Sequence, residues 1–314
     1  MWHVTADDPR LMCAIHRCRV TLSLSDETAA ARLRRVLSES VVGTRFAPTG
    51  DTGGDGDDRP TVVFSDIPRS ADPKPEQEPP DSGSPATIFV IRGEPDSKQW
   101  SEATRLGARR LICSEMLDDR RCVTAAIEAA LRDPWRSDPA SWGSGQEYKT
   151  TEIESADSRD TIIRDLLGEL GAHPLWSESI DLYRLVAEEL VNNALLHAFE
   201  TDRDRRYVPG SFDRMLDGDR VSVRHEINDE VFWLAVTDNA GTLAGARILA
   251  HIQRHLETAG LLDGGGRGLF IAFALANVLA VNIDRGRSTE VSVVFLAGRP
   301  ETHKLVLINT HPES

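Results

Sequence analysis

The sequence predicts an α/β domain built on a parallel sheet, followed by an α+β sandwich. The chain has 314 residues, which is more than one ordinary hydrophobic core organises, so two domains are expected. Short apolar segments alternate with amphipathic ones through the first half, an order typical of parallel sheets covered by helices. In the second half, the helices are segregated from strands that follow one another as hairpins.

A stretch without periodicity separates the two halves. PWRSDPASWGSGQEYK, residues 134–149, is rich in Pro, Gly and Ser and fits neither helical nor strand spacing. We therefore predict a first domain over residues 1–135, a linker over 136–155 and a second domain over 156–314.

Composition limits the class of protein. Hydrophobic residues make up 40% of the chain and charged residues 27%, as in soluble globular proteins. No apolar run approaches the ~18 residues that span a bilayer, and the N-terminus lacks the order of a signal peptide, so we expect a cytoplasmic protein without a membrane segment. A formal net charge of -14 argues against nucleic-acid binding. The four cysteines lack C-x-x-C spacing and are expected to be reduced thiols.

The first half carries alternating strand and helix patterns. The strand segments are short, apolar and rich in β-branched residues, and the helical segments show 3.6-residue spacing. Two segments, 49–60 and 68–85, are too polar and too rich in Gly or Pro to order themselves and are expected to be loops. The predicted strands are 19–25, 61–66, 86–93 and 109–114, and the predicted helices are 27–40, 99–108 and 118–133.

The second half begins with helices and continues into strands. VFWLAVTD, residues 231–238, is the most strongly apolar of the strand segments. A glycine cluster separates two later helical patterns. The predicted helices are 156–170, 177–199, 244–258 and 269–279, and the predicted strands are 219–227, 231–238, 288–297 and 303–309.

The first motif lies on a helix. LVAEELVNNALLHAFE, residues 185–200, has the composition of a helix but repeats polar side chains at one-turn spacing. At 100° per residue, Glu189, Asn193 and His197 fall within an arc of about 80°, on a face that also carries apolar side chains. A carboxylate one turn from a carboxamide suits a hydrated magnesium ion and an attacking hydroxyl or water. The alternative is a helix whose Glu and Asn side chains face solvent.

The second motif follows a strand. In VFWLAVTDNAGTL, residues 231–243, Asp238 ends an apolar strand and Gly241 opens a turn. A carboxylate at a strand end can accept a hydrogen bond from an exocyclic amine, and glycine lets the backbone approach a flat ring. The alternative is an Asx-turn, which is common after strands.

The third motif is a glycine cluster before a helix. In LLDGGGRGLFIAFALANVL, residues 261–279, free N–H groups and the positive end of the helix dipole would face the loop, an arrangement that suits phosphate. The preceding segment is helical, which excludes a Rossmann motif, and the chain contains no G-x-x-x-x-G-K-[ST]. A plain glycine-rich loop is the alternative.

Taken in order, these motifs resemble the GHKL superfamily of histidine-kinase-like (Bergerat) ATPases, which includes gyrases, heat-shock chaperones, sensor histidine kinases and the anti-sigma-factor serine kinases. The matching segments are E-x-x-x-N-A from Glu189 to Ala194, D-x-x-G from Asp238 to Gly241, G-G-G-R-G from Gly264 to Gly268, and STEVSVVF over 288–295. The resemblance covers about residues 155–310 and implies ATP and Mg²⁺ as ligands.

The resemblance also implies roles for individual residues. Asn193 would hold the magnesium ion, and Glu189 would act as general base or orient the nucleophile. Asp238 would receive the adenine amine. Gly241 would shape the base pocket, and Thr289 would support the adenine side. Gly264, Gly266 and Gly268 would border the phosphates under a mobile lid. Arg267 would reach a terminal phosphate, and the alternative is that Arg267 is simply an exposed arginine. Two positions depart from the family's D-x-G-x-G, which carries Ala240 and Thr242 here.

The first half resembles a response-regulator receiver domain through its alternation and through LGARRLI, residues 106–112. By that resemblance, phosphorylation requires carboxylates after the first strand, an acceptor Asp after the third, a hydroxyl after the fourth and a lysine after the fifth. Asp26 and Glu27 lie near the first place, and Asp66 ends TVVFSD as an acceptor should. VIRG offers no hydroxyl and RRLICSEM no lysine. We therefore expect a degenerate receiver used for docking, with Asp66 as a phosphoacceptor as the alternative.

Three functional hypotheses follow. The leading one is a regulatory kinase resembling the anti-sigma-factor serine kinases, which phosphorylates or sequesters a partner protein such as a sigma factor or an anti-sigma antagonist; a homodimer is left open. The second is a histidine kinase, for which residues 156–170 are short as a dimerising hairpin and His173 is the nearby candidate. The third is a nucleotide-binding scaffold without transfer activity.

Overall fold

The computed structural model describes residues 19–40, 61–67, 86–92, 97–131, 142, 148–201, 204–205, 207, 212–256 and 267–311. The chain divides into two compact units. The first comprises Met1–Trp135 and His303–Leu307, and the second Arg136–Thr302 and Ile308–Ser314. Residues 303–307 therefore belong to the first unit, although they follow most of the second unit in the sequence. No helix within the described residues is long and apolar enough to cross a membrane.

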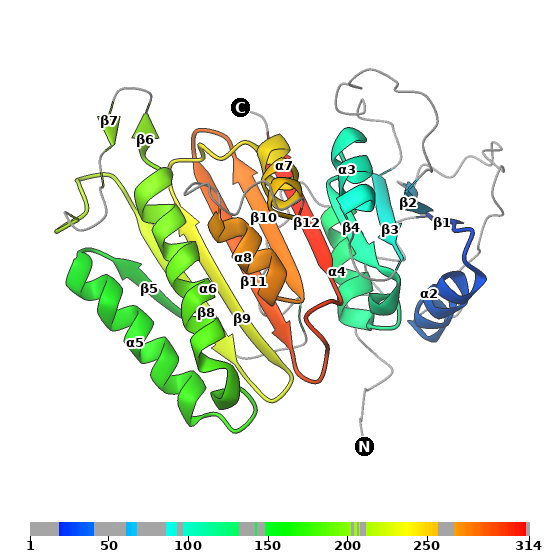
Figure 1. The fold of residues 1–314 in the computed structure, drawn as a ribbon, viewed down its shortest axis with the longest axis horizontal. Helices are drawn as coiled ribbons and strands as arrows, with labels where there is room; N and C mark the ends of the chain where they lie inside the picture. The colour runs from blue at the N-terminus through cyan, green and yellow to red at the C-terminus, as the bar shows by residue number, and fades with distance from the viewer. Residues whose placement is uncertain are drawn as a thin grey trace. The chain divides into compact units, whose positions relative to one another are not determined.

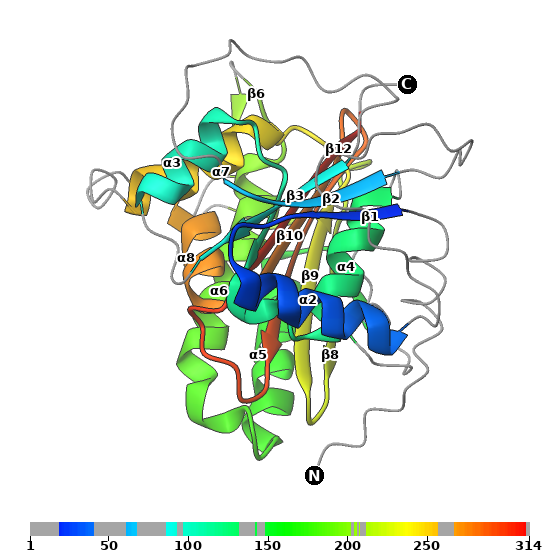
Figure 2. The same cartoon turned by 90° about the vertical axis from the view of Figure 1, so that its right-hand side faces the viewer.

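The first unit is built on four parallel strands. β1 pairs with β2, β2 with β3 and β3 with β4, and residues 305–307 of β12 add antiparallel to β4, so the sheet is mixed. Figure 2 shows α2 and α3 on opposite sides of these strands. The bounds are β1 Arg19–Ser23, α2 Glu27–Ser40, β2 Thr61–Asp66, β3 Ala86–Ile91, α3 Ser97–Arg105, β4 Arg110–Cys113, η1 Ser114–Met116, α4 Arg120–Leu131 and β12 Leu305–His311.

The core of the first unit forms where amphipathic helices meet the sheet. Leu33 and Leu37, one turn apart on α2, are fully buried, as helical spacing predicts. Cys113 and Cys122 form no disulfide bond and are buried. Burial raises the pKa of Cys113 to about 12, so its thiol stays protonated and unreactive. The other two cysteines lie outside the described residues.

The second unit is an antiparallel sheet with helices across one face. The strands are hydrogen-bonded in the order β10-β11-β9-β8-β5, and the last part of β12 lies beside β10. Figure 1 shows α5, α6 and α8 lying across the same face. The bounds are β5 Lys149–Ile153, α5 Ala156–Ala172, η3 Ser177–Ser179, α6 Ile180–Asn192, η4 Asn193–His197, β6 Glu200–Thr201, β7 Asp204–Arg205, β8 Val221–Ile227, β9 Val231–Asp238, α7 Gly245–Leu256, α8 Arg267–Leu275, β10 Val278–Asp284 and β11 Ser288–Leu296.

An aromatic cluster joins α6 to the sheet. Tyr183 of α6 meets Phe232 of β9 and Phe295 of β11 at centroid distances of 5.3 and 4.8 Å. The two phenylalanine rings stack on each other at 5.3 Å. Trp176 packs on Tyr183 and donates from Nε1 to the Asn228 carbonyl at 2.8 Å. Such aromatic pairs contribute about 0.5–1.5 kcal/mol each beyond area burial, so the cluster fixes the rotation of α6 about its axis.

The other face of this sheet carries a buried ion pair. The Arg224 guanidinium lies 5.5 Å from the ring centroid of Tyr148 and 5.4 Å from that of Trp233, and it pairs with the Glu290 carboxylate. Asn282 donates a further hydrogen bond to Glu290 at 3.1 Å. The carboxylate is therefore held by a cation and an amide in a place where an unpaired charge would be costly.

Among the strands of five or more residues in the second half, β5 and β10 differ from the sequence prediction. β5 lies inside the predicted linker, because its exposed and polar sequence, KTTEI, gives no apolar signal. β10 occupies Val278–Asp284, where the sequence predicts the end of a helix and then a loop. α8 instead ends at Leu275. A short apolar run cannot be assigned to helix or strand by periodicity alone, and pairing with β11 decides it here.

The charged stretch after α6 is anchored by one tyrosine. Tyr207 is buried, with Phe199 and Phe212 edge-on to its ring at 5.6 and 5.5 Å. Its hydroxyl donates to Asp219 Oδ2 at 2.9 Å and accepts from the Leu216 N–H at 2.8 Å. This stretch therefore has its own small core.

We expect Arg224→Met to lower the free energy of unfolding by about 3–5 kcal/mol, because it leaves the Glu290 carboxylate buried without its cation. Adding Glu290→Leu removes the stranded charge and should recover most of the loss. Urea unfolding measures both, with Arg184→Met as a control, since the Arg184 side chain is 51% exposed. A double variant no more stable than Arg224→Met would contradict this account.

Candidate functional site

The helix that carries the first motif ends in a π-helical turn. α6 is regular up to Asn192, and the five residues Asn193–His197 continue it with wider, π-helical geometry. The last residue of this turn, His197, is exposed. Single π-helical turns inside α-helices occur frequently at functional sites.

Glu189, Asn193 and Gly268 meet at one point. A Cβ atom placed on Gly268 would lie 2.6 Å from Asn193 Nδ2, 2.7 Å from Glu189 Oε2 and 3.1 Å from Asn193 Oδ1. Gly268 is the second residue of α8, so the first turn of that helix lies directly against both polar side chains. Glycine leaves room for the carboxylate and the amide in these positions, and a larger residue would have to displace the ends of both side chains.

The Asn193 amide is incompletely hydrogen-bonded. Its Nδ2 atom is buried and has no hydrogen-bond partner. A buried polar group without a partner costs about 1–3 kcal/mol, so its retention calls for an explanation. The two ends of an amide offer a donor and an acceptor, and a ligand that supplies both an anionic oxygen and a cation would satisfy them.

The second Glu/Asn pair of the helix does not belong to this cluster. Asn192 Oδ1 accepts a hydrogen bond from Arg159 Nη2 of α5 at 3.0 Å, and Glu188 is half-buried. One residue of rotation, about 100°, separates the two pairs. Of the two, it is the Glu189 and Asn193 pair that meets the start of α8.

Asp238 is a buried carboxylate at the end of β9. It is 5% exposed, and its Oδ1 accepts hydrogen bonds from the N–H groups of Ala240 at 2.9 Å and Gly241 at 3.2 Å. The Asx-turn considered as an alternative is therefore present, and it leaves the second carboxylate oxygen for another donor. Burial raises the pKa of Asp238, and the hydrogen bonds that it accepts offset only part of that effect.

Thr289 lies opposite Asp238 in the register of β11 and β9. Thr289 is 3% exposed. It opposes the effect of burial on the pKa of Asp238, although Thr289 Oγ1 makes no hydrogen bond of ordinary geometry. Two neighbouring strands thus place a buried carboxylate opposite a buried hydroxyl.

Gly241 is required by its own backbone packing. Its φ is +64°, and a Cβ there would lie 2.3 Å from the Asp284 carbonyl oxygen and 2.6 Å from the Arg287 nitrogen. The Gly286 N–H donates to the Gly241 carbonyl at 3.2 Å. The glycine therefore lets the β10–β11 turn pack against the loop after Asp238, which supports one wall of the site.

Thr242 contributes a contact that the sequence did not reveal. Its Oγ1 donates to the Ala198 carbonyl at 2.8 Å and so joins the loop after β9 to the residue that follows the π-helical turn. In the sequence, Thr242 is visible only as a departure from D-x-G-x-G. No local signal shows that its hydroxyl reaches a residue 44 positions away.

The glycine cluster is only partly described. Gly264 and Gly266 lie outside the described residues. Arg267 is exposed at the first position of α8, and Gly268 is buried next to it. The structure thus brings Gly268 to Glu189 and Asn193, and it places Asp238 beside Thr289.

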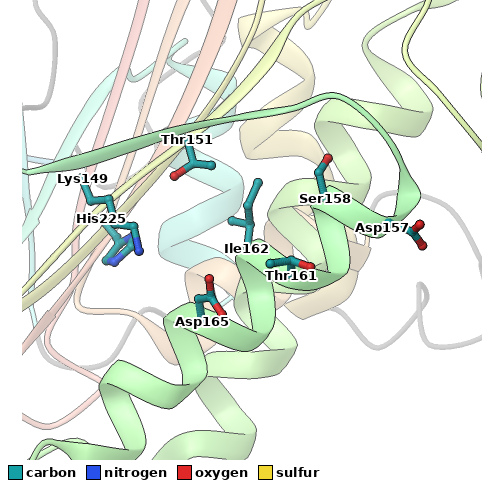
Figure 3. Close-up of a pocket in the computed structure, with 8 residues that line it drawn as sticks. All are labelled: Lys149, Thr151, Asp157, Ser158, Thr161, Ile162, Asp165 and His225. Carbon is teal, nitrogen blue, oxygen red and sulfur yellow. The ribbon is translucent and has the colours of Figure 1, made fainter.

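A cavity elsewhere in this unit contains none of the motif residues. It has a volume of about 290 Å³ and lies between α5 and the strands β5 and β8 (Figure 3). At one side, His225 Nε2 lies 2.9 Å from Glu169 Oε2, and Lys149 pairs with the same carboxylate at 3.1 Å. Burial raises the pKa of Glu169, but the bonds from His225 and Lys149 outweigh it and hold the pKa below its usual range.

In the first unit, Asp66 is already engaged. Its Oδ2 accepts from the Ser25 N–H and hydroxyl, both at 2.6 Å, and from Arg92 Nη2 at 3.0 Å. Burial raises the pKa of Asp66, but these bonds outweigh it and hold the pKa below its usual range. Asp26 caps α2 by accepting from the N–H groups of residues 28 and 29.

No group of three or more His, Cys, Asp or Glu residues in the described chain could hold a metal ion.

Comparison with known proteins adds no identification, since neither a protein-family model nor a curated protein sequence matches the chain.

We expect Gly241→Ala to lower the free energy of unfolding by about 2–5 kcal/mol, because it combines a positive φ with overlap against backbone atoms. Gly298→Ala is the matched control: Gly298 has φ +70° but nothing within 4 Å of its Cβ position, so only the conformational cost of about 1–2 kcal/mol applies. Thermal and urea unfolding compare the two. An equal loss of unfolding free energy in the two variants would show that the close backbone approach at Gly241 does not add to the cost of the substitution.

We expect Asp238→Asn to stabilise the protein without ligand at neutral pH. The folded-state pKa of Asp238 is raised above the ordinary value of about 3.9. The free energy of unfolding therefore falls as the pH rises from about 3.9 through the folded-state pKa, because the carboxyl ionises more readily in the unfolded chain. Asparagine cannot ionise, so the stability difference between variant and wild type should grow over that range and then level off. Urea unfolding across pH measures it, and a difference independent of pH would contradict the assignment.

Proposed function

We propose that the second unit binds Mg-ATP in the manner of the GHKL superfamily, and that the protein is a regulatory kinase that phosphorylates a serine or threonine of a partner protein. The observation that carries this proposal is the meeting of Glu189, Asn193 and Gly268. These residues belong to two motifs more than seventy positions apart in the sequence, and the family resemblance requires them to border one phosphate and metal site.

The polar groups at this point fit a magnesium-bound phosphate. The unpartnered donor of Asn193 would bond to a phosphate oxygen, and the amide oxygen would hold the metal ion. Gly268 in the first turn of α8 borders the same point, where the N–H groups that begin the helix would favour negative charge. Bound magnesium would neutralise phosphate charge during transfer.

The base end of the site is formed by Asp238 and Thr289. The N–H groups of Ala240 and Gly241 donate to Asp238 Oδ1, so Oδ2 would accept the adenine amine. The buried hydroxyl of Thr289 stands opposite on β11 and would bond to the ring or to a water beside it. Gly241 and the β10–β11 turn would form the adjoining wall.

Glu189 supplies the general base in this proposal. Its carboxylate would accept the proton of the partner's hydroxyl as that oxygen forms a bond to the γ-phosphorus. The bond between the γ-phosphorus and the bridging oxygen then breaks, and ADP leaves with the bond's electrons. Positioning and charge stabilisation carry most of such a reaction, which suits a site made of few polar side chains.

The first unit supports a docking role. Arg92 and Ser25 occupy Asp66 Oδ2, and the Asp26 carboxylate caps a helix, so the described residues do not gather the carboxylates that phosphorylation would require. This favours a receiver-like unit that binds a regulatory protein, such as a sigma factor or an anti-sigma antagonist. It also keeps the scaffold without transfer activity as the second candidate.

We expect calorimetry on the full-length chain to show Mg-ATP binding that Asn193→Ala and Asp238→Asn each weaken by at least about tenfold, the cost of one charge-assisted or buried hydrogen bond. Glu188→Gln is the matched control, since Glu188 lies one position from Glu189 and outside the cluster. No binding by folded wild-type protein would exclude the nucleotide site.

Transfer is tested separately from binding. We expect ³²P from labelled ATP to pass to a protein in a partner extract, and Glu189→Gln to reduce that transfer about 10²–10⁴-fold while retaining ATP binding. Tight binding with no transfer by the wild type would favour the scaffold.

A further inference from the structure

The π-helical turn is held from both ends by side chains of other elements. Before the turn, Arg159 of α5 donates from Nη2 to Asn192 Oδ1 at 3.0 Å. After it, Thr242 donates from Oγ1 to the Ala198 carbonyl at 2.8 Å. The five residues between these contacts begin with Asn193.

A turn of this kind needs such support. π-helical geometry is rare and is less favourable than continued α-helix, so it persists where surrounding contacts determine it. The direction of the Asn193 side chain depends on the backbone at the start of the turn. Contacts that fix the two ends therefore fix the orientation of the Asn193 amide towards Gly268.

Thr242 also belongs to the loop that begins with Asp238. Asp238 Oδ1 holds the N–H groups of residues 240 and 241, and Gly241 is packed against the β10–β11 turn. The next residue, Thr242, then reaches the end of the π-helical turn. The base end and the metal end of the site are thus joined through one hydroxyl, at a position where D-x-G-x-G has a glycine and no side chain to form such a bond.

We propose that Thr242 is a positioning residue that couples occupation of the base end of the site to the orientation of Asn193. The inference rests on the proposed Mg-ATP site. A ligand that stabilises the loop after Asp238 also stabilises the bond from Thr242 to the Ala198 carbonyl. The turn then holds the Asn193 amide in the orientation that binds the metal and phosphate. Loss of the hydroxyl uncouples the two ends while leaving each side chain of the site in place.

The test measures ATP affinity of the full-length chain by calorimetry, with Mg²⁺ and with EDTA, for the wild type, Thr242→Val and Thr242→Ser. We expect Mg²⁺ to strengthen ATP binding in the wild type. In Thr242→Val that enhancement should fall about threefold to tenfold, the effect of one hydrogen bond, while affinity in EDTA changes less than twofold. Thr242→Ser keeps the hydroxyl and should restore the enhancement.

Thr237→Val is the matched control, because Thr237 Oγ1 on β9 is buried and has no hydrogen-bond partner. It removes a threonine hydroxyl near the same loop and should leave the Mg²⁺ enhancement unchanged. Asn192→Ala removes the contact before the turn and should reduce the enhancement as Thr242→Val does, which keeps the test decisive if Thr242→Val folds poorly.

The outcomes separate the two levels of inference. Wild-type protein that binds no ATP overturns the proposed function and the coupling with it. Wild-type protein that binds with a clear Mg²⁺ enhancement, retained in full by folded Thr242→Val, overturns the coupling alone. A loss of affinity in Thr242→Val that is equal with Mg²⁺ and with EDTA also overturns it, because that pattern indicates a general structural role.

Discussion

The absence of a side chain at Gly268 is the constraint on which the candidate site depends. With no Cβ there, the first turn of α8 can lie against α6 at the level of Glu189 and Asn193. The aromatic cluster around Tyr183 sets the rotation of α6 that presents these two side chains. A methyl group at position 268 would overlap the ends of the Glu189 and Asn193 side chains and displace them from this point.

The site keeps polar groups in states that are unfavourable without a ligand. Asn193 has a buried donor without a partner, Thr289 has a buried hydroxyl without an ordinary bond, and burial raises the pKa of Asp238. Each costs folding free energy, and the surrounding sheet and aromatic core hold them in place. Such costs are typical of preorganised binding sites, where a ligand meets groups already stripped of water.

The carboxylates of Asp66 and Asp238 are held differently. In the first unit, Asp66 is neutralised internally by Arg92 and by the Ser25 donors, so its pKa is lowered despite partial burial. In the second unit, Asp238 receives backbone N–H groups but no cation, and its pKa is raised. The contrast leaves Asp238, unlike Asp66, without a cation to offset its burial.

Residue patterns alone determined most elements and the order of the motifs. Helical spacing predicted α2 and α5, apolar runs predicted β2 and β9, and the parallel arrangement of the first sheet followed from their alternation. These features depend on local propensity and on periodic burial, which neighbouring residues encode. β5 and β10 escaped prediction because a polar edge strand and a short apolar run acquire strand structure only by pairing.

Only the tertiary structure decided which polar residues meet. Two Glu/Asn pairs share one helix, and the approach of α8 selects Glu189 and Asn193 while Arg159 takes Asn192. The bond from Thr242 to Ala198 and the Ser25–Asp66–Arg92 cluster likewise join residues more than twenty-five positions apart. Contacts of this kind depend on how packed elements are rotated and spaced, which no local pattern records.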